Sequence, residues 1–274
     1  MKTRIIAAAI GLPLLLLIVL ALPSVATAIL VAAMCALAAW ELLFAAGFLR
    51  NVRILIYTCL AVAAVCFWSW LALERIVGAA IVLLYVTALL LEMLAAHTKL
   101  NFRTVCVALF AGLALPYLLG ALVRIRCMEH GELLLLTVFL LTMVPDSGAY
   151  FVGRALGKHK LAPVISPNKT VEGAVGGLLF GVLAMVLYAV VLQFALGFTV
   201  NYLFAAVYGV LGSACSILGD LAFSVIKRQA KIKDYGTLLP GHGGILDRFD
   251  STVTVAPLVE LLLLTIPFAT KLAA

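Results

Sequence analysis

Five aspartates and a dense group of lysines and arginines occupy the second half of the chain, and their spacing suits chemistry on phosphates. The aspartates are Asp146, Asp220, Asp234, Asp247 and Asp250. Asp146 and Asp220 fall inside long apolar runs, where a carboxylate is costly and indicates a functional site. Mg²⁺ combines a few carboxylates with water and phosphate oxygens, so such residues can bind a metal and a phosphorylated substrate. A network of structural ion pairs would use the same residue types, and the spacing alone leaves both interpretations open.

Polar residues around Asp220 repeat at helical spacing. Five of them are separated by three or four positions: Ser216, Asp220, Ser224, Lys227 and Lys231. A continuous helix would align them on one face. Across a loop, Asp247 and Asp250 are three positions apart and can share a face at the start of the next helix. The sequence thus predicts a stripe of hydroxyl, carboxylate and ammonium groups, with a second pair of carboxylates beyond the loop.

Two polar segments, 153–172 and 227–251, interrupt the apolar sequence. In the second, glycines surround His242, and such a turn can direct backbone N–H groups at an anion. In the first, two prolines favour an extended chain, and Thr170 followed by Glu172 predicts a capped helix start. The first segment could form a cationic wall for a polyphosphate, or simply a basic loop facing lipid. Its polar residues include Arg154, Lys158, His159, Lys160, Ser166 and Lys169.

The elements that must position these residues are membrane helices. The chain has 274 residues, is 66% hydrophobic and 11% charged, and has a mean hydropathy of +1.24. Because a spanning helix needs about 20 mostly apolar residues, we expect an all-α polytopic membrane protein with about nine transmembrane helices. The expected spans are 5–22, 24–48, 54–73, 76–96, 104–123, 133–152, 173–197, 203–226 and 252–270. No segment alternates as a β-strand would.

Basic residues are unevenly shared between the two sides that this arrangement implies. Cytoplasmic loops are enriched in Lys and Arg, and with the N-terminus inside, fifteen basic residues fall in inner segments and four in outer ones. We therefore expect a cytoplasmic N-terminus and an extracytoplasmic C-terminus. The first 28 residues resemble a signal peptide, but the long apolar run and the span that follows favour an uncleaved helix.

The organisation expected from these patterns has two parts. Residues 1–130 are expected to form N-terminal transmembrane helices for packing and lipid access. Residues 131–274 are expected to form the C-terminal transmembrane helices, whose cytoplasmic loops 153–172 and 227–251 build the active site.

The segment from Ser224 to Asp250, SVIKRQAKIKDYGTLLPGHGGILDRFD, resembles the signature of phosphatidate cytidylyltransferases, also called CDP-diacylglycerol synthases. That pattern reads S-x-apolar-K-R, four residues, K-D-x-small, then apolar-P-x-H-G-G-apolar-x-D-R-apolar-D, and every fixed position is met. P-D-S-G-A-Y at 145–150, G-K-H-K-L-A-P at 157–163 and S-P-x-K-T-x-E-G at 166–173 also resemble the family. These motifs cover about the C-terminal half, whereas the first 130 residues match only in being apolar and membrane-spanning.

The resemblance implies that CTP and phosphatidate react to give CDP-diacylglycerol and pyrophosphate, in phospholipid biosynthesis. Mg²⁺ is the implied ion, with room for a second cation. CTP, phosphatidate and membrane lipids are the expected partners; no nucleic acid is expected, and a homodimer is left open. The implied location is the cell (inner) membrane, crossed several times, with the active site on the cytoplasmic side.

The resemblance also implies roles for individual residues, in three groups. The expected metal ligands are Asp220 and Asp247, with Asp250 and Asp146 as further candidates. The residues expected to act in catalysis are Asp220, Asp247, Lys227, Arg228, Lys233 and His242. The residues expected to bind substrate are Ser224, Gly243, Gly244, Arg248, Lys158, Lys160, Ser166 and Lys169.

Two other classes of function compete with this interpretation. A polytopic transporter would also carry intramembrane acids and basic inner loops, but it is expected to show broken helices and repeated halves, and neither is evident in the sequence. A phosphotransferase that consumes CDP-diacylglycerol would need D-G-x-x-A-R followed by two more aspartates, a pattern that this sequence lacks.

Overall fold

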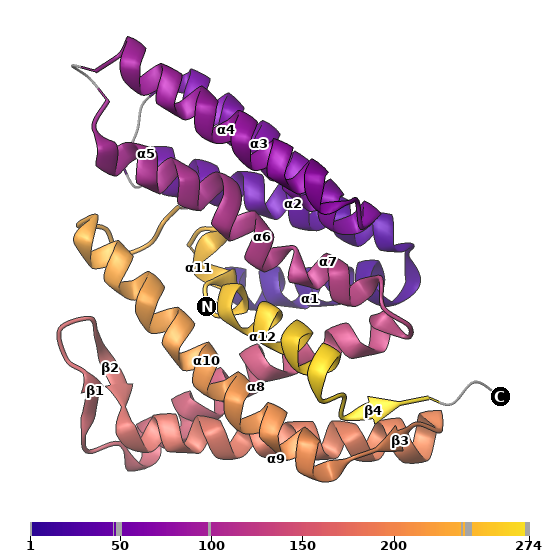
Figure 1. The fold of residues 1–274 in the computed structure, drawn as a ribbon. Helices are drawn as coiled ribbons and strands as arrows, with labels where there is room; N and C mark the ends of the chain where they lie inside the picture. The colour runs from indigo at the N-terminus through magenta and orange to yellow at the C-terminus, as the bar shows by residue number, and fades with distance from the viewer. Residues whose placement is uncertain are drawn as a thin grey trace. The chain divides into compact units, whose positions relative to one another are not determined.

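The protein is described here by a computed structural model that covers residues 2–45, 47, 51–97, 100–236, 238 and 243–271. It is mostly helical, and it forms two compact units. The first unit comprises residues 1–132 and 227–249, and the second comprises residues 133–226 and 250–274. Figure 1 follows the chain through both. Residues 227–249 of the signature segment therefore belong to the same compact unit as the N-terminal helices, whereas Ser224 and Asp250 at its ends belong to the second unit.

The first unit is built from four long helices, a broken fifth segment and one short helix. The long helices are α1 (Lys2–Ala21), α2 (Ser24–Trp40), α3 (Val52–Leu71) and α4 (Arg75–Ala95). A π-helical turn, η1 (Glu41–Ala45), extends α2. The broken segment comprises α5 (Phe102–Leu109), η2 (Phe110–Ala114), α6 (Leu115–Leu119) and α7 (Ala121–Arg126), and the short helix is α11 (Leu246–Phe249). α3 packs against both α2 and α4, as Figure 1 shows.

One buried polar cluster links three elements of the first unit. The hydroxyl group of Tyr85 on α4 lies 2.8 Å from Thr58 Oγ1 on α3 and donates to the backbone oxygen of Ala108 on α5 at 2.9 Å. A Cβ at Gly112 would lie 2.6 Å from the Tyr85 ring, so glycine makes room for this tyrosine. Buried hydroxyl groups are costly unless they are hydrogen-bonded, and this cluster satisfies that requirement inside apolar helices.

The second unit contains most of α8 (Gly131–Leu156) and α10 (Tyr202–Gln229), together with α9 (Val171–Leu196) and α12 (Thr252–Thr265). A β-hairpin joins α8 to α9. Its strands, β1 (Lys160–Ala162) and β2 (Ser166–Thr170), are antiparallel and pair Lys160 with Thr170. A second antiparallel pair joins β3 (Thr199–Val200) to β4 (Ala269–Thr270).

Glycines let the helices of the second unit approach closely. A Cβ at Gly209 of α10 would lie 2.5 Å from the Cα atom of Val182 on α9. A Cβ at Gly212 of α10 would lie 2.6 Å from the side chain of Leu141 on α8. Small residues at helix crossings allow this close packing in membrane proteins. They fix how near α10 comes to α8 and α9.

Helices occur at all nine predicted positions, but their number does not settle how many cross the membrane. Seven described helical segments are long and apolar enough to span it: Ser24–Phe44, Val52–Leu71, Arg75–Ala95, Phe102–Arg126, Gly131–Leu156, Val171–Leu196 and Tyr202–Gln229. The protein is thus a multi-pass membrane protein. Its α12 has 14 residues, about 21 Å at 1.5 Å per residue, against a hydrocarbon core of about 30 Å. Nine crossings and the orientation of both termini stay predictions.

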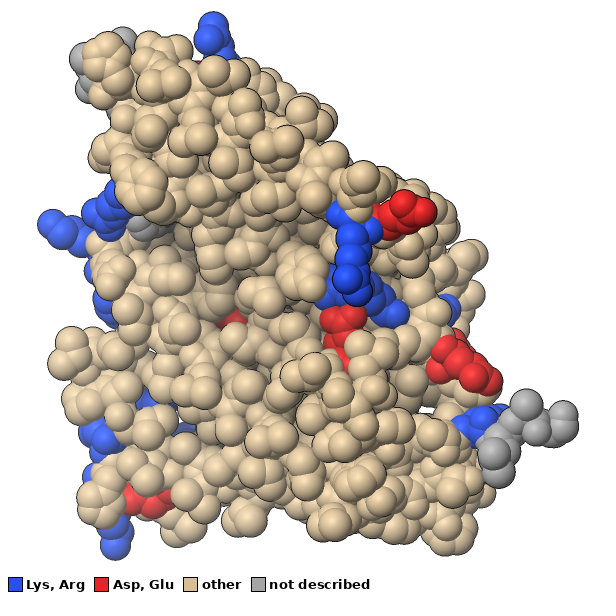
Figure 2. Space-filling view, in the orientation of Figure 1, with Lys and Arg blue, Asp and Glu red and all other residues tan. Residues whose placement is uncertain are grey.

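Uncharged residues dominate the face drawn in Figure 2, where acidic and basic side chains gather at only a few places. Many large apolar side chains are exposed on the spanning helices, among them Leu83 and Leu84 on α4 and Leu179 on α9. A soluble protein rarely exposes so much continuous apolar surface. Such a surface is the one expected to face lipid.

The structure differs from three local predictions made from the sequence. Short strands are present although no segment alternates, because strands of two to five residues are too short to show a period. The predicted stripe ends early: α10 stops at Gln229, and Lys231 adopts a φ of 59° that turns the chain away. Asp247 and Asp250 do not share a helix, because Asp247 lies in α11 and Asp250 lies in the turn before α12.

Replacing Gly209 by alanine is expected to destabilise the protein, because the added Cβ would press on the backbone of α9. Overpacking of this kind costs about 1–3 kcal/mol. Thermal unfolding of the purified protein in detergent should show a lower Tm for Gly209→Ala. Gly11→Ala is the matched control, since among the described residues no atom outside the adjacent helix backbone lies within 4 Å of a Cβ at Gly11. An unchanged Tm for Gly209→Ala would contradict this packing.

Candidate active site

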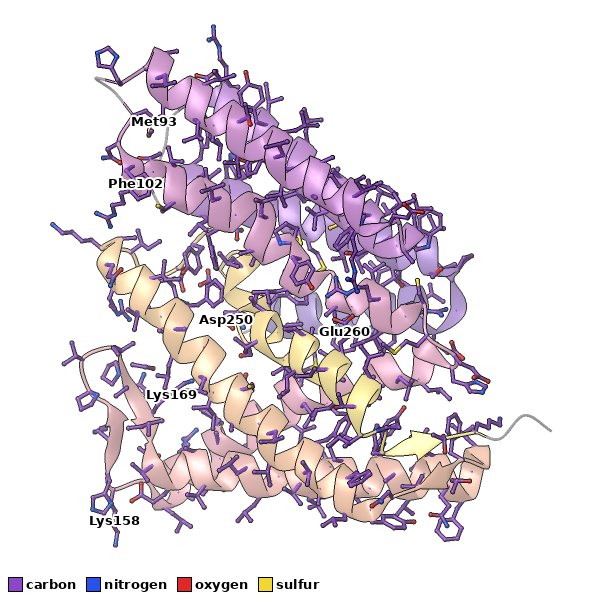
Figure 3. The ribbon with its side chains drawn as sticks, in the orientation of Figure 1. Met93, Phe102, Lys158, Lys169, Asp250 and Glu260 are labelled. Atoms are coloured by element: carbon purple, nitrogen blue, oxygen red, sulfur yellow. The ribbon has the colours of Figure 1, made fainter. Side chains whose placement is uncertain are left out.

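A hollow of about 520 Å³ lies in the second unit, lined by residues of α8, the β-hairpin, α9 and α10. Its polar lining comprises Asp146, Tyr150, Arg154, Ser166, Asn168, Lys169, Thr170 and Asp220. In Figure 3 Lys169 extends from the hairpin toward α10, whereas Lys158 points away from α10. Carboxylate, ammonium and guanidinium groups thus converge on one cavity, whose size is typical of ligand sites.

The hairpin that carries Lys169 is fixed to the start of α9. Thr170 is the N-cap residue of α9, and its Oγ1 accepts from the backbone N–H of Gly173 at 3.1 Å, which confirms the predicted cap. Glu172, in the first turn, accepts from the backbone N–H groups of Lys158 at 3.1 Å and His159 at 3.2 Å. The Nδ1 atom of His159 lies 2.6 Å from the same carboxylate. Glu172 therefore closes the base of the hairpin.

Asp220 lies in the hollow with two partners. Lys169 Nζ forms an ion pair with Asp220 Oδ2, and Ser224 Oγ, one helical turn further along α10, donates to Asp220 Oδ1 at 3.3 Å. The side chains of Lys169 and Asp220 are each 26% exposed. An ion pair with this exposure can exchange partners with a ligand, because its charges are not fully removed from water.

Asp247, in the first unit, is enclosed instead, with only 3% of its side chain exposed. Its Oδ1 accepts from Lys227 Nζ at 2.9 Å, and its Oδ2 accepts from the backbone N–H groups of Tyr235 at 2.8 Å and Gly244 at 3.0 Å. Lys227 Nζ also lies 5.5 Å from the centre of the Tyr235 ring, within cation–π range. Gly243 has a φ of 86°, which glycine adopts without strain. Asp247 therefore anchors the loop between α10 and α11, which is called the signature loop below.

A second carboxylate reaches this loop from the N-terminal half of the chain. Glu41, at the start of η1, is fully buried and accepts from the backbone N–H groups of Ile245 and Leu246, both at 2.8 Å. A Cβ at Gly236 would lie 2.7 Å from Glu41 Oε1, and a Cβ at Gly244 would collide with the same carboxylate. The sequence interpretation missed Glu41. Its one signal is an acidic residue inside the predicted span 24–48.

The other predicted site residues take no part in the contacts of Asp220, Asp247 and Glu41 described above, or lie outside the described residues. Five basic side chains are exposed. Arg228, Lys233 and Arg248 belong to the first unit, and Lys158 and Lys160 belong to the second, where neither is among the residues that line the hollow. Asp250 is 7% exposed, and its Oδ1 accepts from the backbone N–H of Ser251 at 2.8 Å. His242 lies outside the described residues.

The structure therefore divides the predicted residues between two clusters. The hollow contains Asp146, Ser166, Lys169 and Asp220, with Ser224 beside Asp220. The loop cluster contains Lys227, Asp247, Gly243 and Gly244. Tyr150 and Asn168, which also line the hollow, were missed. Tyr150 follows Asp146 by one helical turn, and Asn168 directly precedes Lys169, so both lay within reach of the motifs.

The carboxylates of the hollow fit a divalent cation better than Asp247 does. Mg²⁺ is commonly bound by one or two carboxylates together with water and substrate phosphates, and Asp146 and Asp220 line the same cavity. Both oxygens of Asp247 are already engaged by an ammonium group and two amides. Within the described ranges, no group of three His, Cys, Asp or Glu side chains could hold a metal ion by itself. An ion in the hollow would thus need water or phosphate oxygens as well.

Comparison with known proteins places the chain among cytidylyltransferases. It matches the sequence model of the Cytidylyltransferase family over residues 2–266. It is 41% identical over 160 residues to the phosphatidate cytidylyltransferase of Staphylococcus saprophyticus, covering 58% of this chain and 60% of that protein. It is 39% identical over 185 residues to the Bacillus subtilis protein of that name, covering 67% and 65%. It is 43% identical over 152 residues to the Haemophilus influenzae one, covering 52% and 51%.

The fold and the hollow define a multi-pass helical membrane protein with clustered carboxylates and cations. The chain belongs to the Cytidylyltransferase family. The matched regions span about half to two thirds of the length of these curated relatives. The match to the family model, over residues 2–266, includes the residues of both the hollow and the signature loop.

Asp247→Asn is expected to destabilise the protein, because an amide group would replace an oxygen that accepts from Lys227 or from the loop amides. Removing one partner of a buried ion pair costs about 3–5 kcal/mol. The Tm in detergent should fall clearly below that of the unaltered protein. Asp234→Asn is the control, since Asp234 is exposed in the same segment. Equal Tm values for the two variants would show that Asp247 is not an anchor.

Proposed function

We propose that this protein is a phosphatidate cytidylyltransferase, which transfers CMP from CTP to phosphatidate and gives CDP-diacylglycerol and pyrophosphate. The observation that carries the proposal is the hollow within membrane helices, where Asp146, Asp220, Arg154 and Lys169 face one cavity. A nucleotide from water and a lipid from the bilayer can both reach such a site. The names of the relatives support the choice of substrates.

The reaction needs charge compensation more than it needs a base. A phosphate oxygen of phosphatidate attacks the α-phosphorus of CTP. A new P–O bond forms as the bond to the oxygen bridging the α- and β-phosphorus atoms breaks, and pyrophosphate leaves with that electron pair. The attacking oxygen is already ionised at neutral pH, so no proton has to be removed. The barrier is the approach of two anions, which preorganised cations such as Lys169 and Arg154 lower.

We also propose a divalent cation, Mg²⁺, with Asp220 and Asp146 as its protein ligands. When bound, such an ion neutralises charge on transferring phosphates. Lys169 would then move from Asp220 to a substrate phosphate, because the ion would take its place at the carboxylate. We propose that Asp247 anchors the signature loop and that Lys227 serves as the ion-pair partner of Asp247. Asp250 is the remaining candidate for a second cation.

We place the protein in the cell membrane with its substrate site on the cytoplasmic side. CTP is a cytoplasmic nucleotide, and the basic residues predominate in the segments predicted to be inner ones. The exposed Arg228, Lys233 and Arg248 would then attract the anionic substrates and lipid headgroups on that side.

The proposal is tested by supplying the purified protein with CTP labelled at the γ-phosphate, with and without phosphatidate. Labelled pyrophosphate should appear only with phosphatidate, together with CDP-diacylglycerol, and a chelator of divalent ions should abolish its release. Release of labelled phosphate instead of pyrophosphate would indicate that the protein hydrolyses CTP at the γ-phosphate and does not transfer CMP. No turnover in the presence of phosphatidate and Mg²⁺ would overturn the proposal.

Asp220→Asn is expected to remove most activity while the protein stays folded. Its partner Lys169 is partly exposed and can be solvated when the ion pair is lost. Loss of one preorganised electrostatic contact typically lowers kcat by about 10²–10³-fold. The Mg²⁺ concentration for half-maximal activity should rise as well. A variant with normal Mg²⁺ dependence and near-normal kcat would exclude Asp220 as a ligand.

A further inference from the structure

We infer that Glu41 is a positioning residue for the reaction proposed above: it sets the backbone of the signature loop and thereby the place of Asp247. The inference rests on the proposed function for its catalytic readout. It gives the N-terminal helices, which otherwise contribute apolar spans, a direct part in holding the signature loop.

The first observation is that two carboxylates bind three consecutive amides. The backbone N–H of Gly244 donates to Asp247 Oδ2, that of Ile245 to Glu41 Oε1, and that of Leu246 to Glu41 Oε2. Both bonds to Glu41 measure 2.8 Å and join residues more than 200 positions apart in sequence. Because Leu246 immediately precedes Asp247, fixing its amide fixes where the Asp247 side chain begins.

The second observation is the fit of the loop glycines to Glu41. A Cβ at Gly244 would collide with the Glu41 carboxylate, and one at Gly236 would lie 2.7 Å from Oε1. Both glycines stand in the segment that carries the family signature. Because neither glycine has a side chain, the loop backbone can lie directly against the Glu41 carboxylate.

The third observation is the surroundings of Glu41. It is fully buried beside Leu42 and Leu43, at the end of a segment apolar enough to span the membrane. An ionisable group in such a place is expensive and indicates a functional role. A residue that served only to fill space there would be apolar, as both neighbours are. The geometry instead gives Glu41 one task, the binding of the loop amides.

The test compares Glu41→Ala and Glu41→Gln with Leu43→Ala, a buried apolar change at the same helix end. For each variant kcat and KM for CTP and phosphatidate are measured together with Tm. Glu41→Ala should lower kcat by about 10²-fold, the loss that a misplacement of about 1 Å can cause even when the altered residue lies away from the reacting groups. Glu41→Gln keeps the size and one acceptor oxygen, so it should retain more activity. Leu43→Ala should lower Tm while its folded fraction keeps a near-normal kcat.

A double-variant comparison separates positioning from a general loss of structure. Gly244→Ala alone should lower kcat, because its Cβ meets the Glu41 carboxylate. In Glu41→Ala the space is vacated, so adding Gly244→Ala should cause little further loss. Groups in direct contact show such non-additive effects, whereas independent sites add. Additive losses would overturn the inference.

Two further results would also overturn it. A normal kcat for Glu41→Ala, beside an active unaltered protein, would leave the proposed function intact and remove the role of Glu41. If both Glu41 variants lose activity only in proportion to their loss of folded protein, and their folded fraction keeps a near-normal kcat as in Leu43→Ala, the role of Glu41 is structural only. An unaltered protein with no phosphatidate-dependent release of pyrophosphate would instead refute the proposed function, and this inference with it.

Discussion

A carboxylate placed among apolar helices must find donors within the protein, and this requirement shapes the signature loop. Asp247 and Glu41 together bind the amides of Gly244, Ile245 and Leu246. Asp247 also binds Lys227, at the end of α10. The glycine positions follow from this arrangement, since the loop backbone must lie against the carboxylates. An N-terminal residue thereby holds a C-terminal motif in place.

The same requirement is met differently in the hollow of the second unit. Asp220 pairs with Lys169 and accepts from Ser224, yet the ion pair is 26% exposed, against 3% for Asp247. Exposure separates the two roles: an enclosed carboxylate with all its oxygens engaged maintains a loop, whereas a partly exposed one can exchange a lysine for a ligand. Charged residues of one family pattern thus divide into anchors and candidate ligands.

Much of this organisation could be predicted from local patterns in the sequence. Runs of about 20 apolar residues located the helices, and Thr170 with its neighbours located the start of α9. The carboxylates at Asp146 and Asp220 stood out because charge is rare in such runs. What depends on folding could not be predicted. Lys169, on strand β2, pairs with Asp220 on helix α10, and Glu41 lies 204 positions from Ile245. The left-handed turn at Lys231 ended a stripe that spacing alone had extended.

The most direct test of the account is hydrogen exchange at the amides of Gly244, Ile245 and Leu246 in the unaltered protein. These amides lie in a loop and at the first residue of a short helix, where exchange is ordinarily fast because few hydrogen bonds protect it. If Asp247 and Glu41 bind them as described, all three should exchange slowly, like the amides within the spanning helices. Exchange as fast as that of the exposed Lys233 and Asp234 would contradict the central claim that buried carboxylates hold the signature loop.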